Sequence, residues 1–100
     1  MRWGKKRESV SVTREITISN KFGMHARPAA EFARRANSFR SEITLVRDGV
    51  RFSATSLMDI LRASLEQGAT LTVEAHGVDA EEAVDSLVQA LSKFQEQEGR

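Results

Sequence analysis

The dipeptide Asp48-Gly49 constrains the fold of this chain more than any other short feature, because it separates two segments in which polar and apolar residues alternate. A two-residue hairpin loop of type I′ needs positive φ angles, which aspartate and glycine tolerate. The segments 41–47 and 50–53 are therefore predicted to form a β-hairpin. A two-residue loop pairs Leu45 with Phe52, and this register gathers the apolar side chains on one face. These side chains are Ile43, Leu45, Val50, Phe52 and Ala54.

The remaining periodic segments fix the fold class. Strands are predicted at 15–19 and 70–75, where apolar and polar residues alternate. Helices are predicted at 26–37, from Thr55 or Ser56 to Gly68, and after Asp79. The order strand-helix-strand-strand-helix-strand-helix predicts a two-layer α+β fold, with the helices on one face of the sheet and water on the other.

Length, charge and composition restrict the domain organisation and the kind of function. The 100 residues suit one domain, which we expect at 14–95, between a basic tail at 1–13 and a short tail at 96–100. The chain has no cysteine, which excludes disulfides and Cys-ligated metals, and its two histidines do not predict a metal site. A net charge of +1 and the lack of a long apolar run favour a cytoplasmic protein with no cofactor, no nucleic-acid partner and no membrane insertion.

The segment from Gly23 to Ala30 carries the most specific chemistry. Gly23 allows a tight turn, His25 follows at the predicted start of a helix, and Pro28 lies in the first helical turn, where a missing N–H costs little. A helix N-terminus offers unpaired amides and a positive dipole end to an anion, and Arg27 adds a permanent cation. A neutral imidazole is a nucleophile, so His25 is a candidate phosphoryl acceptor. A histidine at this position also serves as a helix cap or as an ordinary surface residue, and the residues alone leave these alternatives open.

The stretch Gly-Met-His-Ala-Arg-Pro-Ala-Ala resembles the active-site motif of the HPr family, the histidine-containing phosphocarriers of the bacterial phosphotransferase system. The resemblance extends over about residues 14–94. It includes Phe39-Arg40-Ser41, the segment 54–58 before the second predicted helix, and the segment 77–83 before the third. It implies an open-faced β-sandwich in which three helices cover one face of a four-stranded antiparallel sheet.

The resemblance also implies roles for individual residues. His25 accepts a phosphoryl group on Nδ1 from phosphorylated Enzyme I and donates it to an EIIA-type domain, with Arg27 stabilising the group. The protein is then a monomeric carrier rather than an enzyme. Ser56 matches a serine that HPr kinase/phosphorylase modifies in some lineages. The partner-binding face comprises the apolar Leu57 and Met58, bordered by Ala26, Ala30, Arg34 and Leu61.

The chain departs from the family pattern at Phe22 and at two residues beside Ser56, and these two count against modification of Ser56. Phe22 stands where sugar-type carriers often have a small polar residue, which is more like the nitrogen-branch paralogue. Thr55 and Asp59 replace residues common beside the regulatory serine, and Asp59 puts a negative charge on the partner-binding face. The alternative function is that of a regulator that acts through Ser56 phosphorylation and partner binding rather than sugar transport. Nucleic-acid binding is disfavoured, because the strands lack the exposed aromatic pairs on which bases stack.

Overall fold

The computed structural model describes residues 8–21 and 23–98. Within these ranges the chain forms seven elements in the predicted order: β1 (Val10–Thr17), α1 (Ala26–Asn37), β2 (Glu42–Arg47), β3 (Val50–Ser53), α2 (Leu57–Arg62), β4 (Thr70–Gly77) and α3 (Ala80–Glu98). The predicted basic tail lies outside the described residues from 1 to 7, and so does Phe22 with the distinction drawn from it.

The four strands form one antiparallel sheet in the order β1-β4-β2-β3. The predicted hairpin register is confirmed, since Leu45 pairs with Phe52 and Arg47 pairs with Val50. Asp48 and Gly49 have φ angles of 51° and 79°, as a type I′ turn requires. Val50 shares the apolar face with Phe52 but is 53% exposed.

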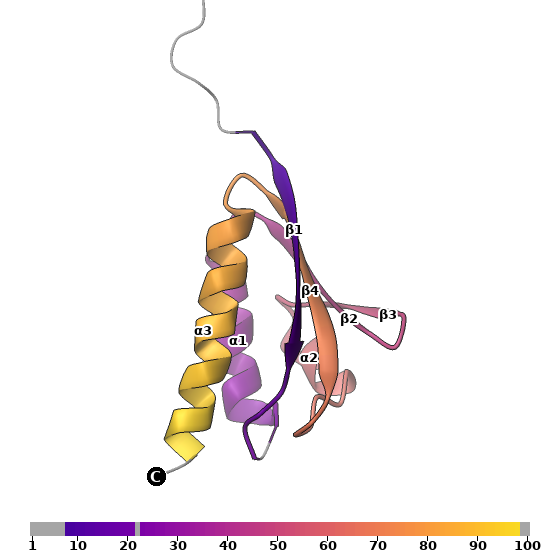
Figure 1. The fold of residues 1–100 in the computed structure, drawn as a ribbon, viewed down its shortest axis with the longest axis vertical. Helices are drawn as coiled ribbons and strands as arrows, with labels where there is room; N and C mark the ends of the chain where they lie inside the picture. Colours follow the sequence, from indigo (N-terminus) through magenta and orange to yellow (C-terminus); the bar gives the residue numbers. More distant parts are fainter. Residues whose placement is uncertain (1–7, 22, 99–100) are drawn as a thin grey trace, which may run out of the picture.

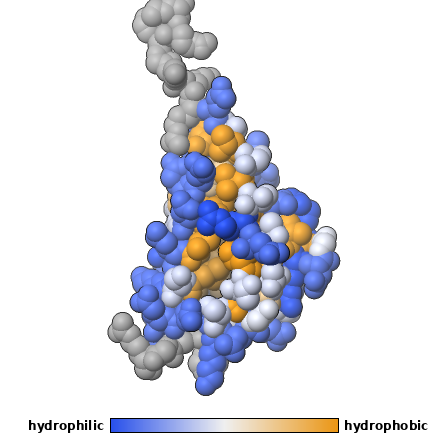
Figure 2. Space-filling model, viewed as in Figure 1, coloured by the Kyte–Doolittle hydropathy of each residue, from blue (hydrophilic) through white to orange (hydrophobic). Residues whose placement is uncertain are grey.

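The core lies between the sheet and the helices (Figure 1). Leu71, Val73 and Ala75 alternate along β4 and are buried. α3 packs against β1, β4 and α1, and α2 contacts α1 and β3. Figure 2 shows hydrophobic residues along the seam between α3 and the sheet, with hydrophilic residues on the outer side of the helix. The predicted α+β class and two-layer arrangement are therefore confirmed. No helix in the described part of the chain is long and apolar enough to cross a membrane.

The predicted first strand was wrong at both ends. β1 covers Val10–Thr17, so residues 10–13, which were assigned to the tail, pair with β4 instead. The alternation was hidden by Arg14, which pairs with Val73 on the helix-covered face. Its guanidinium reaches Asp85 of α3 at 3.3 Å, so the charge lies at the margin of the core with a partner.

Two helix ends also differ from prediction. α2 ends at Arg62 rather than at Gly68, and Ser64 then takes a φ of 53°, which a helix does not allow. α3 continues to Glu98, beyond the predicted start of the C-terminal tail at residue 96. Polar residues on an exposed helix end carry no apolar period, which is why the pattern stopped earlier than the helix.

Asp79 ties the start of α3 to the loop after α1. Its carboxylate accepts hydrogen bonds from the backbone N–H of Arg40 and Ser41, both at 2.9 Å, and from Ser41 Oγ at 2.6 Å. The Ser41 hydroxyl is the main reason that the pKa of Asp79 lies below its usual value. Burial opposes this effect, and the backbone N–H groups of Arg40, Ser41 and Asp79 itself add to the lowering.

Candidate functional site

A short turn delivers His25 to the start of α1. The N–H of Gly23 donates to the carbonyl of Asn20 at 3.0 Å, and Asn20 Nδ2 donates back to the carbonyl of Gly23 at 2.7 Å. Asn20 is buried, and so is Met24, whose N–H donates to the carbonyl of Leu65 at 2.8 Å. The residues before His25 are therefore tied to the segment that follows α2.

Gly23 is required at this turn for two independent reasons. Its φ of +64° lies in the left-handed region, which residues with a Cβ rarely adopt. A Cβ at this position would lie 2.5 Å from the carbonyl oxygen of Leu65 and 2.7 Å from Cα of Glu66. Because both are backbone atoms, neither can rotate away, and the absence of a side chain lets the two segments touch.

His25 is the N-cap residue of α1, in an extended conformation with φ −76° and ψ −175°. Its side chain makes no capping hydrogen bond, although its carbonyl accepts the N–H of Ala29 at 2.9 Å. His25 is exposed. The capping interpretation therefore does not describe its imidazole, and a large partner can reach the ring from solvent.

The first turn of α1 is suited to an anion. Its first residues, Ala26 and Arg27, carry N–H groups that precede the intrahelical ladder, whereas Pro28 has none. The first turn holds no acidic side chain, so nothing on it opposes the positive end of the helix dipole. Arg27 is exposed, and within the described residues its side chain takes part in no hydrogen bond or ion pair. Its guanidinium is therefore available to a ligand at this helix end.

A shallow depression beside His25 was missed by sequence reasoning. It is lined by Met24, His25, Ser64, Leu65 and Glu66. The last three follow α2, about forty positions along the chain, and no local pattern signals that they meet the His25 turn. Glu66 places an exposed carboxylate at this surface.

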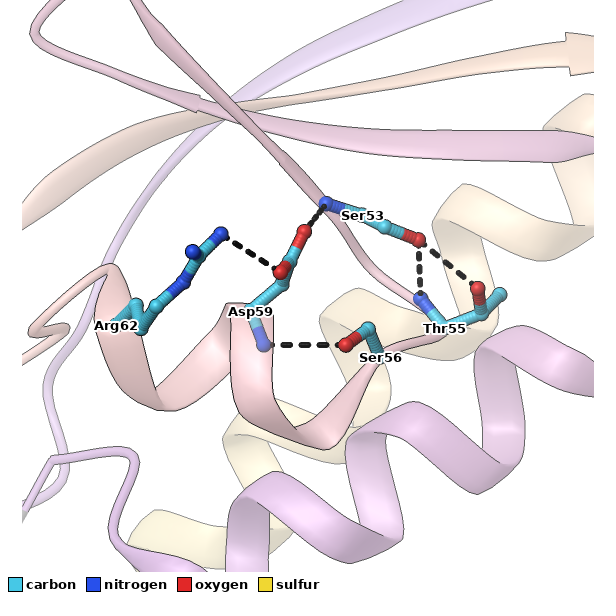
Figure 3. Close-up of polar contacts among 5 residues, drawn as sticks. All are labelled: Ser53, Thr55, Ser56, Asp59 and Arg62. Carbon is cyan, nitrogen blue, oxygen red and sulfur yellow. Dashed lines mark hydrogen bonds and ion pairs between the residues drawn. The ribbon is translucent and has the colours of Figure 1, made fainter.

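Ser56 has a structural role that its position predicted. It is the N-cap of α2, and its Oγ accepts the N–H of Asp59 at 3.1 Å. The Asp59 carboxylate accepts the N–H of Ser53 at 2.9 Å and an N–H of Arg62 at 2.8 Å (Figure 3). Next to this network, the hydroxyl oxygens of Ser53 and Thr55 lie 2.9 Å apart and share a hydrogen bond. Ser56 is half-buried within this network.

The predicted partner-binding residues lie on two helices that contact each other, α1 and α2. On α2, Met58 is 66% exposed, and Leu57 and Leu61 are 37% and 36% exposed. On α1, Ala26 and Arg34 are exposed and Ala30 is half-buried, and each of the three is four positions from the next. Such spacing puts the three on one side of α1. The second histidine, His76, lies in β4 on the polar face of the sheet, where Nδ1 is 2.7 Å from Ser11 Oγ.

The comparisons with known proteins agree with this geometry. The family profile described as PTS HPr component phosphorylation site matches residues 12–93. The phosphocarrier protein HPr of Haemophilus influenzae is 46% identical over 74 residues, which cover 74% of this chain and 85% of that protein. The HPr-like protein Crh of Halalkalibacterium halodurans is 35% identical over 82 residues, which cover 82% of this chain and 98% of that protein.

A solved structure supports the same assignment. The crystal structure of HPr-C-His from Thermoanaerobacter tengcongensis superposes with a TM-score of 0.80 at 37% identity, and covers 84% of this chain and 94% of that one. Sequence similarity and structural similarity to HPr proteins therefore both extend over most of the described residues. The chain belongs to the HPr family, the phosphocarrier proteins of the phosphotransferase system, which carry phosphoryl groups rather than act as enzymes.

Proposed function

We propose that His25 is the phosphoryl acceptor of this carrier, and that it takes the group from phosphorylated Enzyme I and gives it to an EIIA-type domain. The single observation that carries the proposal is the position of an exposed histidine at the N-terminus of α1, inside the segment that matches the family profile. The imidazole does not serve as the cap of this helix.

The transfer at His25 is a displacement at phosphorus. The lone pair on Nδ1 of the neutral ring attacks the phosphoryl group, a new N–P bond forms, and the bond to the donor breaks with its electron pair leaving on the donor atom. The ring proton stays on Nε2. The reverse displacement returns the group to the acceptor domain. No bond of the carrier's backbone changes in either step.

The start of α1 stabilises the transferred group. The N–H groups of Ala26 and Arg27 and the positive end of the helix dipole favour phosphoryl oxygens, and the Arg27 guanidinium supplies a full charge with several donors. These groups hold the anion without binding the rest of the donor. The carrier can therefore release the phosphoryl group to the next protein.

Partner recognition is assigned to the apolar residues on α2 and to the side of α1 next to them. Met58, Leu57 and Leu61 expose apolar surface, and methionine adapts to differently shaped partners. Ala26 and Ala30 leave room for a close approach, and Arg34 offers a charge to acidic partners. We propose that the monomer presents this face in the cytoplasm to Enzyme I and to EIIA-type domains in turn.

Incubation with phosphoenolpyruvate and Enzyme I tests the proposal. The wild type is expected to gain one acid-labile phosphoryl group, His25→Ala is expected to gain none, and His76→Ala is expected to behave as wild type. The His76 variant is a matched control, because it removes the other histidine from a distant face. Labelling of His25→Ala at the wild-type level would refute the proposal.

A regulatory function through Ser56 is the second candidate, and the 35% identity to an HPr-like protein Crh favours it. HPr kinase/phosphorylase would transfer the terminal phosphoryl group of ATP to Ser56 Oγ, with ADP as the leaving group and the hydroxyl proton passing to a base of the kinase. That oxygen already accepts the backbone N–H of Asp59, so the modification adds a dianion at the first turn of α2. Partner binding that survives His25→Ala and is abolished by Ser56→Asp would support this function over phosphoryl transfer.

A further inference from the structure

Arg47 crosses from the hairpin to the segment that follows α2. It is the last residue of β2, and its side chain is 23% exposed. Its Nη1 donates to the carbonyl of Ala63 at 2.8 Å and to the carbonyl of Ser64. On the other side of the guanidinium, the exposed Asp48 carboxylate lies 3.8 Å from Nε. One side chain thus binds two successive backbone carbonyls beyond the helix end.

The segment held by Arg47 has an unusual local conformation. Ser64 has a φ of 53°, and such an angle in a residue with a Cβ persists only where neighbouring contacts impose it. The N–H of Ser64 donates to the carbonyl of Leu61 at 3.2 Å, and the N–H of Glu66 donates to the carbonyl of Ser64 at 3.0 Å. The carbonyls of Ala63 and Ser64 are the groups that the guanidinium fixes from outside the segment.

The same segment forms one wall of the surface around His25. The carbonyl of Leu65, one residue after Ser64, accepts the N–H of Met24, and Gly23 lies against Leu65 and Glu66 without room for a Cβ. Ser64, Leu65 and Glu66 line the depression together with His25. An unbroken chain of contacts therefore leads from Arg47, through Ser64 and Leu65, to the residue before His25.

We propose that Arg47 is a positioning residue for His25: it holds the 63–66 segment against the turn that orients the imidazole. The inference rests on the proposed function of His25. Group transfer is sensitive to such support, because a displacement of about 1 Å at the reacting group can cost about a hundredfold in rate. Both carbonyls accept from the same nitrogen, Nη1, so a lysine ammonium, which carries three N–H donors on one nitrogen, can replace part of this contact.

Two measurements test the role of Arg47, with Arg51→Ala as the matched control. Arg51 lies on the same hairpin but bonds to Glu74 on the open face of the sheet, 2.8 Å away. Amide hydrogen exchange of Met24 is expected to accelerate about tenfold in Arg47→Ala, beyond any change in global exchange, and to stay unchanged in Arg51→Ala. The limiting rate of phosphorylation by Enzyme I, counted per folded molecule at saturating donor, is expected to fall about tenfold in Arg47→Ala. Arg47→Lys is expected to restore part of that rate.

The outcomes separate this proposal from the proposed function. A wild type that takes no phosphoryl group on His25 overturns the proposed function, whereas the Met24 amide still decides whether Arg47 holds the His25 turn. Unchanged Met24 exchange in Arg47→Ala overturns the positioning role. An equal loss of limiting rate in Arg47→Ala and Arg51→Ala also overturns the positioning role, because it would show that any change in the hairpin slows the transfer.

Discussion

Replacing Gly23 by alanine is expected to destabilise the fold and to displace His25. The φ of +64° alone costs a residue with a Cβ about 1–2 kcal/mol. The new methyl would lie 2.5 Å from a backbone oxygen and 2.7 Å from a backbone carbon, and forced overpacking of this kind costs about 1–3 kcal/mol. The free energy of unfolding should fall by about 2–5 kcal/mol. This loss is a large share of the total free energy of unfolding of a typical domain, about 5–15 kcal/mol.

Gly49→Ala is the matched control. Its φ is +79°, yet a methyl group at this position would have no neighbour within 4 Å, so only the backbone contribution of about 1–2 kcal/mol is expected. Urea unfolding of the wild type and both variants measures the difference. At about 4–8 °C per kcal/mol for a domain of this size, thermal unfolding also resolves it. Equal losses in the two variants would refute the close contact between Gly23 and the 65–66 backbone.

Three further perturbations probe other parts of the molecule. Asp79→Asn should lower the free energy of unfolding at neutral pH. Because folding lowers the pKa of Asp79, the carboxylate stabilises the fold above the unfolded-state pKa of 3.8, and this stabilisation is lost as the pH falls below that value. The unfolding free energies of wild type and variant should therefore converge in acid, and a difference that stays constant with pH would contradict the carboxylate's role. Arg27→Ala should slow phosphoryl transfer about tenfold or more in a single-turnover assay, while the unfolding free energy changes by less than about 0.5 kcal/mol; unchanged kinetics would remove Arg27 from the mechanism. Ser56→Ala should lower the free energy of unfolding, measured with urea, by about 1 kcal/mol because the α2 cap is lost, and Ser56→Asp should recover most of that loss. An equal loss in both variants would argue against capping by the side-chain oxygen.

Features set by local sequence were predictable. The Asp48-Gly49 turn requires positive φ angles that few residue pairs allow, and the register of the hairpin follows from its length. α1 has the bounds that its apolar period indicated, 26–37, because Phe32 and its alanine neighbours are buried on one side. The cap of α2 was predictable to within two residues, Thr55 or Ser56, because the hydroxyl that caps a helix acts within its own first turn, and Ser56 is the one that does so.

Features set by contacts between distant segments were not predictable. Arg14 broke the apolar alternation of β1, and its side chain is 45% exposed and reaches Asp85 on α3, a contact that no local pattern signals. The segment after the early end of α2 is bonded by Arg47, which comes from another element. His25 itself was visible as a motif, but the 64–66 segment beside it was not, because its approach depends on the missing Cβ of Gly23.

The most direct test of the central claim is to locate the bond that the phosphoryl group forms. Phosphorus–nitrogen correlation by NMR, on ¹⁵N-histidine-labelled protein phosphorylated with phosphoenolpyruvate and Enzyme I, identifies the bonded atom without a mutation. The account predicts one phosphorus coupled to Nδ1 of His25, with the ring of His76 unmodified. Phosphorus bonded to His76, or carried only by the hydroxyl of Ser56, would contradict it.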